Sequence, residues 1–183
     1  MNLGTTLGRL VALFDRAGLA YMLSGSVASS FYGITRSTRD MDLVIDPDES
    51  QLIKFVNLLQ EASFYVSERN AMDALRRRSQ FNVIDMETAW KADLVIRKNR
   101  AFSLMEFSRR SQQEVFGISL WMCSIEDTIL AKLEWAKDTE SERQLGDVEG
   151  MLKVQGETVD KNYLKHWAKE LGVGQLLARF VES

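Results

Sequence analysis

Residues 20–46 contain the pattern that most restricts how this chain can fold. A short apolar run over 20–23 stops at the turn-forming residues 24–26, and residues 27–33 have the composition of a short helix that ends at a glycine. A polar segment over 34–39 then leads into 40–46, where charged and apolar residues alternate as in a strand. This order predicts a strand, a tight turn, a helix and a second strand, and therefore an α/β fold.

The rest of the chain continues this pattern and then changes to helices. Further strands are predicted at 64–67, 81–86, 90–97, 113–116 and 118–123. Helices are predicted at 3–17, 49–62, 70–78, 124–137, 141–154, 160–171 and 174–182. We therefore expect a mixed α/β (α+β) core over 1–123, with a C-terminal helical region over 124–183 packed on it.

The composition excludes several kinds of chemistry. The 183 residues include one cysteine, Cys123, and one histidine, His166, so an intramolecular disulfide or a His-rich zinc site is excluded. A metal would have to be held by carboxylates, which favours Mg²⁺ or Mn²⁺. The chain lacks a signal-peptide pattern and an apolar run of about 20 residues, so we expect a cytoplasmic protein that does not enter the membrane.

Three aspartates form a candidate metal site. Asp40 and Asp42 share one face of the predicted strand because side chains alternate with a period of two. Two carboxylates about 6–7 Å apart repel each other unless a cation lies between them. Asp93, on another predicted strand, would complete a cluster that binds metal and takes the proton from an attacking hydroxyl. The alternative is that these acids only solvate an exposed strand edge.

Gly25 and Ser26 form a candidate phosphate site beside these acids. They lie between the predicted strand and helix, where a glycine lets backbone N–H groups approach a ligand and a helix N-terminus favours an anion. Most Gly-Ser pairs are ordinary turns or helix caps, and this reading remains open for the pair alone. The ordered set of Gly-Ser, Asp-x-Asp and a later strand aspartate is more specific than any of its parts.

In this ordered set the chain resembles the DNA polymerase β-like nucleotidyltransferases. The segments that carry the resemblance are 23–26, 40–43 and Asp93, and it extends over about residues 19–97. Within that superfamily, the short length and the Arg-x-Thr-x-Asp-x-Asp stretch over 36–42 are most similar to minimal nucleotidyltransferases, including those of toxin–antitoxin pairs and the abortive-infection type E toxins.

The resemblance implies a mixed, palm-like sheet flanked by helices and a nucleotidyl transfer that releases pyrophosphate. It implies that Gly25 and Ser26 hold the triphosphate of an NTP, and that Asp40 and Asp42 bind two Mg²⁺ ions. Asp93 would activate the acceptor hydroxyl. The acceptor remains open between RNA such as tRNA, a protein and a small molecule. A non-catalytic nucleotide sensor, or an antitoxin-like protein that binds a partner, is the alternative function.

Several other residues are weaker candidates for the site. Arg36 and Arg39 flank Thr38 immediately before the Asp-x-Asp motif and either contact the triphosphate or pair with the aspartates. Lys132 is a candidate nucleotide-binding residue, because a hairpin of helices would bring it together with Arg143 and Asp147; solvated helix faces are the alternative.

The charge distribution adds a candidate nucleic-acid surface. The net charge is −3, but residues 76–110 contain nine basic and four acidic side chains. This basic band would guide a phosphate-bearing ligand, or it consists only of solvated helix ends and turns. Trp90, Trp121 and Trp135 are expected in the core, Cys123 is expected to be buried, and His166 and Trp167 are expected to be packed or on the surface.

Overall fold

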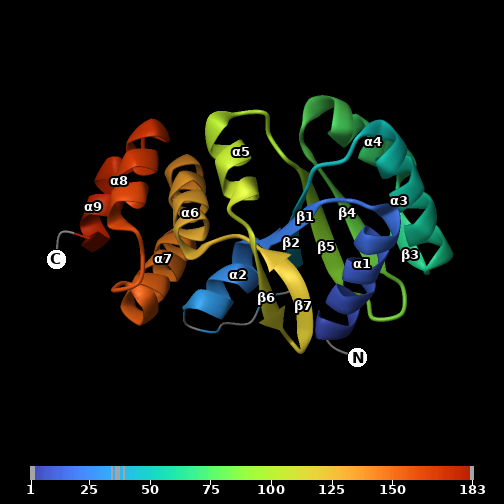
Figure 1. The fold of residues 1–183 in the computed structure, drawn as a ribbon, viewed down its shortest axis with the longest axis horizontal. Helices are drawn as coiled ribbons and strands as arrows, with labels where there is room; N and C mark the ends of the chain where they lie inside the picture. Colours follow the sequence, from blue (N-terminus) through green and yellow to red (C-terminus); the bar gives the residue numbers. More distant parts are fainter. Residues whose placement is uncertain (1–2, 34, 36–37, 39, 182–183) are drawn as a thin grey trace.

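In the computed structural model, seven strands form one mixed sheet (Figure 1). The structure describes residues 3–33, 35, 38 and 40–181. The strands are β1 (Tyr21–Ser24), β2 (Asp40–Ile45), β3 (Phe64–Val66), β4 (Gln80–Asp85), β5 (Lys91–Ile96), β6 (Ser111–Val115) and β7 (Ile118–Met122). Their order is β3-β4-β5-β2-β1-β7-β6, in which β2/β5 and β1/β7 are parallel and the other neighbours are antiparallel. The predicted α/β class with a mixed sheet is confirmed.

The described helices agree with the predicted ones except at one place. They are α1 (Leu3–Ala17), α2 (Gly25–Tyr32), α3 (Glu49–Glu61), α4 (Glu68–Arg77), α5 (Ala101–Ser108), α6 (Ile125–Thr139), α7 (Glu142–Gln155), α8 (Lys161–Glu170) and α9 (Gly174–Val181). The sequence did not predict α5. Its buried face includes Ser103, whereas Leu104 and Met105 are exposed, so the apolar spacing typical of an amphipathic helix is missing.

The two faces of the sheet have different surroundings. Met41, Leu43 and Ile45 of β2 are fully buried and belong to a hydrophobic cluster that includes Phe14 of α1 and Phe55 of α3. Helices α1, α3 and α4 lie on that side, whereas α2, α5 and α6 lie on the other (Figure 1). Because strand side chains alternate, the residues between these apolar ones point to the second face, where the candidate site lies.

A second hydrophobic cluster lies in the C-terminal helices. It consists of Phe102 of α5 and buried side chains from α6 to α9, whereas the first cluster runs from Leu3 to Cys123. Helices α6 and α7 both contact α2, so the second cluster lies beside the strand–turn–helix unit. The division into a core over 1–123 and a helical region over 124–183 stays a prediction.

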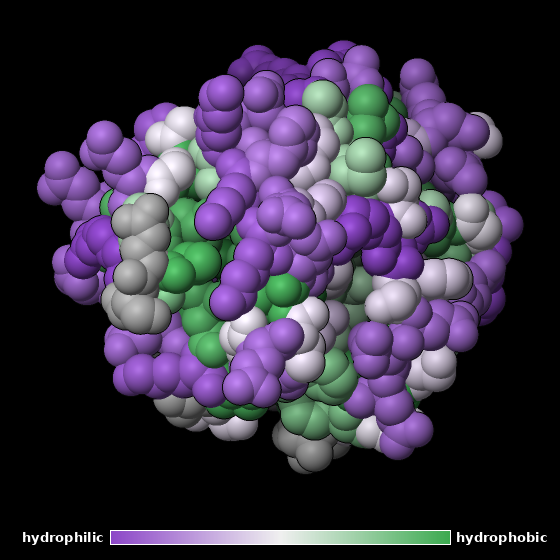
Figure 2. Space-filling model, turned by 60° about the vertical axis from the view of Figure 1, so that its left-hand side comes forward, coloured by the Kyte–Doolittle hydropathy of each residue, from purple (hydrophilic) through white to green (hydrophobic). Residues whose placement is uncertain are grey.

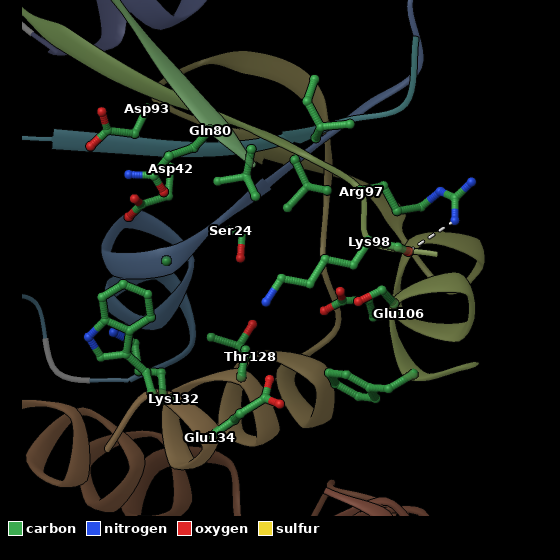
Figure 3. A pocket seen from close by; sticks show the side chains of 18 of the residues that line it. Ser24, Asp42, Gln80, Asp93, Arg97, Lys98, Glu106, Thr128, Lys132 and Glu134 are labelled. Carbon is green, nitrogen blue, oxygen red and sulfur yellow. Dashed lines mark hydrogen bonds between the residues drawn. The ribbon is translucent and has the colours of Figure 1, made fainter. Parts of the chain in front are cut away.

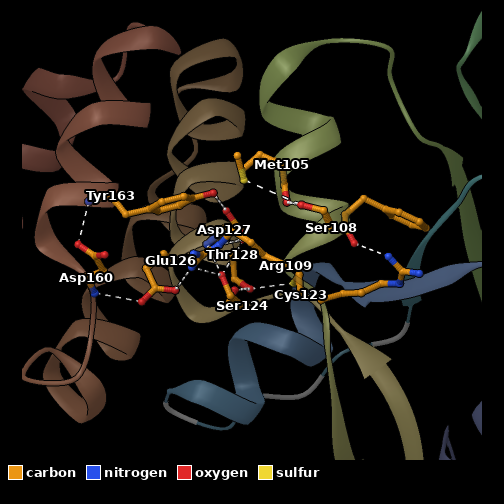
Figure 4. Close-up of polar contacts among 12 residues, drawn as sticks. Met105, Ser108, Arg109, Cys123, Ser124, Glu126, Asp127, Thr128, Asp160 and Tyr163 are labelled. Carbon is orange, nitrogen blue, oxygen red and sulfur yellow. Dashed lines mark hydrogen bonds and ion pairs between the residues drawn. The ribbon is translucent and has the colours of Figure 1, made fainter.

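A polar network around Asp127 connects α5, α6 and α8 (Figure 4). The buried Asp127 carboxylate accepts hydrogen bonds from the hydroxyls of Ser124, at 2.7 Å, and Tyr163, at 2.6 Å. Arg109 donates to the same carboxylate at 3.2 Å, and its guanidinium lies 3.9 Å from the centre of the Tyr163 ring. Ser124 also caps α6, because its side chain accepts a hydrogen bond from the Asp127 backbone N–H.

The aromatic and sulfur side chains agree with the expectations only in part. Cys123 is buried as expected, and burial raises the pKa of its thiol to about 12. The expectation that Trp121 and Trp135 belong to the core is wrong, because they are 37% and 58% exposed. Trp121 lies near the Arg110 guanidinium, and Trp135 lines the pocket described below.

Much of the face drawn in Figure 2 is hydrophilic. In the face drawn in Figure 2, hydrophobic side chains form small areas among hydrophilic ones. Within the described ranges, no helix is both long and apolar enough to cross a membrane.

Candidate active site

Four neighbouring strands bring polar side chains into one row on the second face of the sheet. In the strand register Ser24 of β1 lies opposite Asp42 of β2, Asp42 lies opposite Asp93 of β5, and Asp93 lies opposite Asn82 of β4. The next row contains Asp40 opposite Lys91. The sheet therefore brings Asp42 and Asp93 together, although they are far apart in the sequence.

The turn between β1 and α2 is fitted closely to Asp42. Gly25 has a φ of +62°, and a Cβ at this position would lie 1.9 Å from Asp42 Oδ2. The Ser26 backbone N–H donates to the same oxygen at 3.4 Å. Only glycine allows both this backbone conformation and this close approach. The predicted Gly-Ser turn therefore lies directly against Asp42.

A pocket of about 490 Å³ extends from these residues toward α5 and α6 (Figure 3). Gly25, Ser26, Asp42 and Asp93 line one end. The remaining lining residues include Gln80, Lys98, Arg100, Glu106, Thr128, Lys132, Glu134, Trp135 and Asp138. In Figure 3, Lys98 and Glu106 lie at the opposite end from the two aspartates. This size suits a small organic ligand.

Burial and neighbouring charges perturb Asp42. Burial is the largest cause that raises the pKa of this carboxyl above its ordinary value of 3.8, and the nearby Asp93 and Asp40 raise it further. The Ser26 N–H and the Lys132 ammonium act in the opposite direction. A bound cation would therefore stabilise the charged form of Asp42.

Lys132 is buried beside the same end of the pocket. Only 5% of its side chain is exposed, and its ammonium donates to Asp147 Oδ2 at 2.6 Å and to Gln144 Oε1 at 2.8 Å. Asp147 also accepts from the Ser29 hydroxyl of α2 at 3.3 Å. The helix hairpin thus brings Lys132 and Asp147 together as expected, whereas Arg143 is exposed and is not among the lining residues.

The three aspartates offer the ligand atoms that Mg²⁺ prefers, but they are not arranged as a complete metal-binding site. Asp40, Asp42 and Asp93 offer only carboxylate oxygens, which Mg²⁺ and Mn²⁺ prefer as ligands. In the described part of the chain, no three or more His, Cys, Asp or Glu side chains form a group that could hold a metal ion. Asp40 instead lies 3.4 Å from the Lys91 ammonium. Asp42 and Asp93 would form the centre of a metal site, and Asp40 would have to leave Lys91 to join it.

The other predicted basic residues, which are Arg36, Arg39 and those of the band over 76–110, do not all lie at the pocket. Arg36 and Arg39 lie outside the described residues. Within the basic band, Arg97, Lys98 and Arg100 line the pocket. In contrast, Arg109 is engaged with Asp127. The middle run of the band therefore lies at the site, and nucleic-acid binding by the band stays a prediction.

Lys91 and Glu106 are among the site and pocket residues that the sequence did not predict. Lys91 lies two positions before Asp93 on the same strand face, a spacing visible in the sequence. Glu106 belongs to α5, the helix that the sequence did not predict. Burial is the largest cause that raises the pKa of its carboxyl to about 7, and the nearby Asp127 raises it further. No sequence signal identified Glu106, because nothing predicted the helix that carries it.

Known structures share this fold. An antigenic nucleotidyltransferase-like protein from Paracoccidioides brasiliensis matches with a TM-score of 0.63 and 16% identity, over 96% of this chain and 86% of that one. ANT(2'')-Ia in complex with adenylyl-2''-tobramycin matches with a TM-score of 0.56 and 13% identity, over 98% of both chains. The lincosamide antibiotic adenylyltransferase LnuA, bound to lincomycin, matches with a TM-score of 0.55 and 15% identity, over 82% of this chain and 96% of that one.

The chain therefore has the fold of a nucleotidyltransferase. The similarity of known nucleotidyltransferase structures confirms the predicted resemblance to a minimal nucleotidyltransferase at the level of the fold. No protein-family model and no curated protein sequence matches the chain. The toxin–antitoxin type stays a prediction.

Proposed function

We propose that this protein is a metal-dependent nucleotidyltransferase, which transfers an NMP from an NTP to a hydroxyl group and releases pyrophosphate. The observation that carries the proposal is the contact of the β1–α2 turn with Asp42, itself opposite Asp93. This arrangement places backbone N–H groups at a helix N-terminus directly beside paired carboxylates. A triphosphate and its metal ions require both kinds of group at one place.

The turn and Lys132 would bind the triphosphate. Gly25 and Ser26 begin α2, so their N–H groups and the helix dipole favour phosphate oxygens. The Lys132 ammonium lines the same pocket and supplies a positive charge there. Arg36 and Arg39 are proposed to add charge on the triphosphate from the polar segment before β2.

The aspartates would hold the metal and move the proton. Asp40 and Asp42 would bind two Mg²⁺ ions, for which Mn²⁺ is an alternative, and Asp93 would bind one of them. When bound, the metal would neutralise the triphosphate and lower the pKa of the acceptor hydroxyl. The acceptor oxygen forms a bond to the α-phosphorus, the bond to pyrophosphate breaks, and Asp93 takes the hydroxyl proton.

The acceptor would occupy the end of the pocket formed by α5 and α6. Glu106 lies at that end together with Lys98 (Figure 3), and Glu134 and Trp135 of α6 also line the pocket. Among the structural neighbours, LnuA was solved with lincomycin and ANT(2'')-Ia with an adenylylated tobramycin, which supports a small hydroxyl compound as acceptor. RNA and a protein side chain are the other acceptors to test.

The test is a transfer assay with each of the four α-labelled NTPs and Mg²⁺. RNA, protein and small-molecule fractions of a cell extract serve as separate acceptor pools, and both label transfer and pyrophosphate are measured. We expect one pool to be labelled, and Asp42→Asn to lose this activity. Asp15→Asn, at an exposed position on α1, is the matched control that should keep it. Absence of labelling in every pool would refute the transfer reaction.

A nucleotide-sensing or antitoxin-like role remains the alternative function. Calorimetry separates the two, because tight NTP binding without pyrophosphate release favours the sensor.

A further inference from the structure

Lys91 contacts two of the three carboxylates of the candidate metal site. Its ammonium lies 3.1 Å from Asp93 Oδ2 and 3.4 Å from Asp40 Oδ1, and its side chain is 37% exposed. In the parallel register of β2 and β5, Lys91 lies opposite Asp40, one row from the Asp42–Asp93 pair. The ammonium thus bridges Asp40 and Asp93, which belong to two neighbouring rows.

The repulsion among the three aspartates explains why the positively charged Lys91 side chain lies beside them. Asp40, Asp42 and Asp93 project from the same face of the sheet, where three carboxylates repel one another. The lysine ammonium offsets part of that repulsion without any metal. A divalent cation and an ammonium bound to the same two carboxylates would repel each other at such distances, so both cannot be held there equally well.

We infer that Lys91 is a resident counter-ion that a metal ion must displace from Asp40 and Asp93. This inference rests on the proposed function. It implies that free metal binds weakly, because binding must break the ion pairs of Lys91. Metal that arrives with a triphosphate gains additional contacts at the β1–α2 turn, so the nucleotide complex overcomes this competition. Lys91 is in this sense a positioning residue that couples metal binding to nucleotide binding.

The experiment measures Mn²⁺ affinity without nucleotide, by the loss of the free-ion signal in electron paramagnetic resonance. We expect Lys91→Met to bind Mn²⁺ about five-fold more tightly than the wild type, or more, the factor equivalent to a surface ion pair. Lys91→Arg keeps the charge and should stay near the wild-type affinity. Lys54→Met, at an exposed position on α3, is the matched control and should not change it.

A second readout is the thermal midpoint with and without Mg²⁺. Lys91→Met should melt lower than the wild type without metal and should gain more from added Mg²⁺. Unchanged or weaker Mn²⁺ binding by Lys91→Met would overturn the role of Lys91. If the wild type then still binds Mn²⁺ and Asp42→Asn does not, the proposed function stands without that role. If neither wild type nor Lys91→Met binds Mn²⁺, with or without NTP, both proposals fail.

Discussion

Glu106 gives a pH-dependent test of how the pocket is built. The perturbation is Glu106→Gln, which keeps the shape of the side chain and removes its titration. Burial, followed by the nearby Asp127, raises the pKa of Glu106 from its ordinary value of 4.5 to about 7. The folded state therefore favours the neutral form, and this stabilisation is complete below pH 4.5 and is lost as the pH rises through about 7.

The expected size follows from the same two values. A shift from 4.5 to about 7 corresponds to roughly 3 kcal/mol between the two protonation states. Most of the loss falls between pH 5.5 and 8, where the wild type should lose roughly 2 kcal/mol of unfolding free energy through this group. The glutamine does not ionise, so the variant should not show this loss.

The assay is urea unfolding of both proteins at pH 5.5 and pH 8, followed by circular dichroism. We expect Glu106→Gln to gain stability relative to the wild type as the pH rises. Glu61→Gln, at an exposed position at the end of α3, controls for the general loss of one negative charge. Parallel pH profiles for wild type and Glu106→Gln would refute the reasoning.

Three further changes test other contacts. Gly25→Ala should destabilise the fold by about 1–2 kcal/mol from its φ alone, and should abolish transfer because its Cβ would overlap Asp42; urea unfolding and the transfer assay measure both effects. Asp127→Asn should cost about 2–3 kcal/mol, measured by urea unfolding, because it weakens the hydrogen bonds from Arg109 at the end of α5, from Tyr163 of α8 and from Ser124 at the start of α6. At pH 7, Asp85→Asn should cost about 2 kcal/mol, because it removes the charge-assisted hydrogen bond with the half-buried Arg9 at 2.6 Å. Burial raises the pKa of Asp85, but its hydrogen bonds and Arg9 lower it below 3.8, so the penalty should shrink as the pH falls below that value; equal penalties at pH 7 and pH 3 would contradict this.

The strand–turn–helix–strand unit could be predicted because its signals are local. A period of two places Asp40 and Asp42 on one strand face, and the Gly25 turn follows directly from an apolar run. The structure has these elements as β1, α2 and β2. The adjacency of Asp42 and Asp93, in contrast, depends on which strands pair. The sequence suggests this adjacency only through the combination of the two motifs, because the spacing itself does not define which strands are neighbours.

Lys91 and α5 could not be predicted for two different physical reasons. Lys91 acts across strands, and its contact with Asp40 depends on a parallel register that only the assembled sheet defines. Helix α5 is short and buries Ser103 while it exposes Leu104, so tertiary contacts stabilise it where the apolar pattern does not. A local sequence pattern does not indicate residues whose positions depend on such tertiary contacts.

The same distinction explains why the transfer chemistry is easier to infer than the acceptor. The end of the pocket at Gly25, Asp42 and Asp93 is made of motif residues on α2, β2 and β5, and the proposed phosphate and metal chemistry rests on these residues. Glu106 of α5 lies at the opposite end of the pocket (Figure 3). With a pKa of about 7, this carboxyl donates a hydrogen bond in more acidic solution and adds a negative charge in more basic solution. An acceptor seated there must match a group that changes its hydrogen bonding near neutrality, so the pH dependence of acceptor affinity would identify this end as the acceptor site.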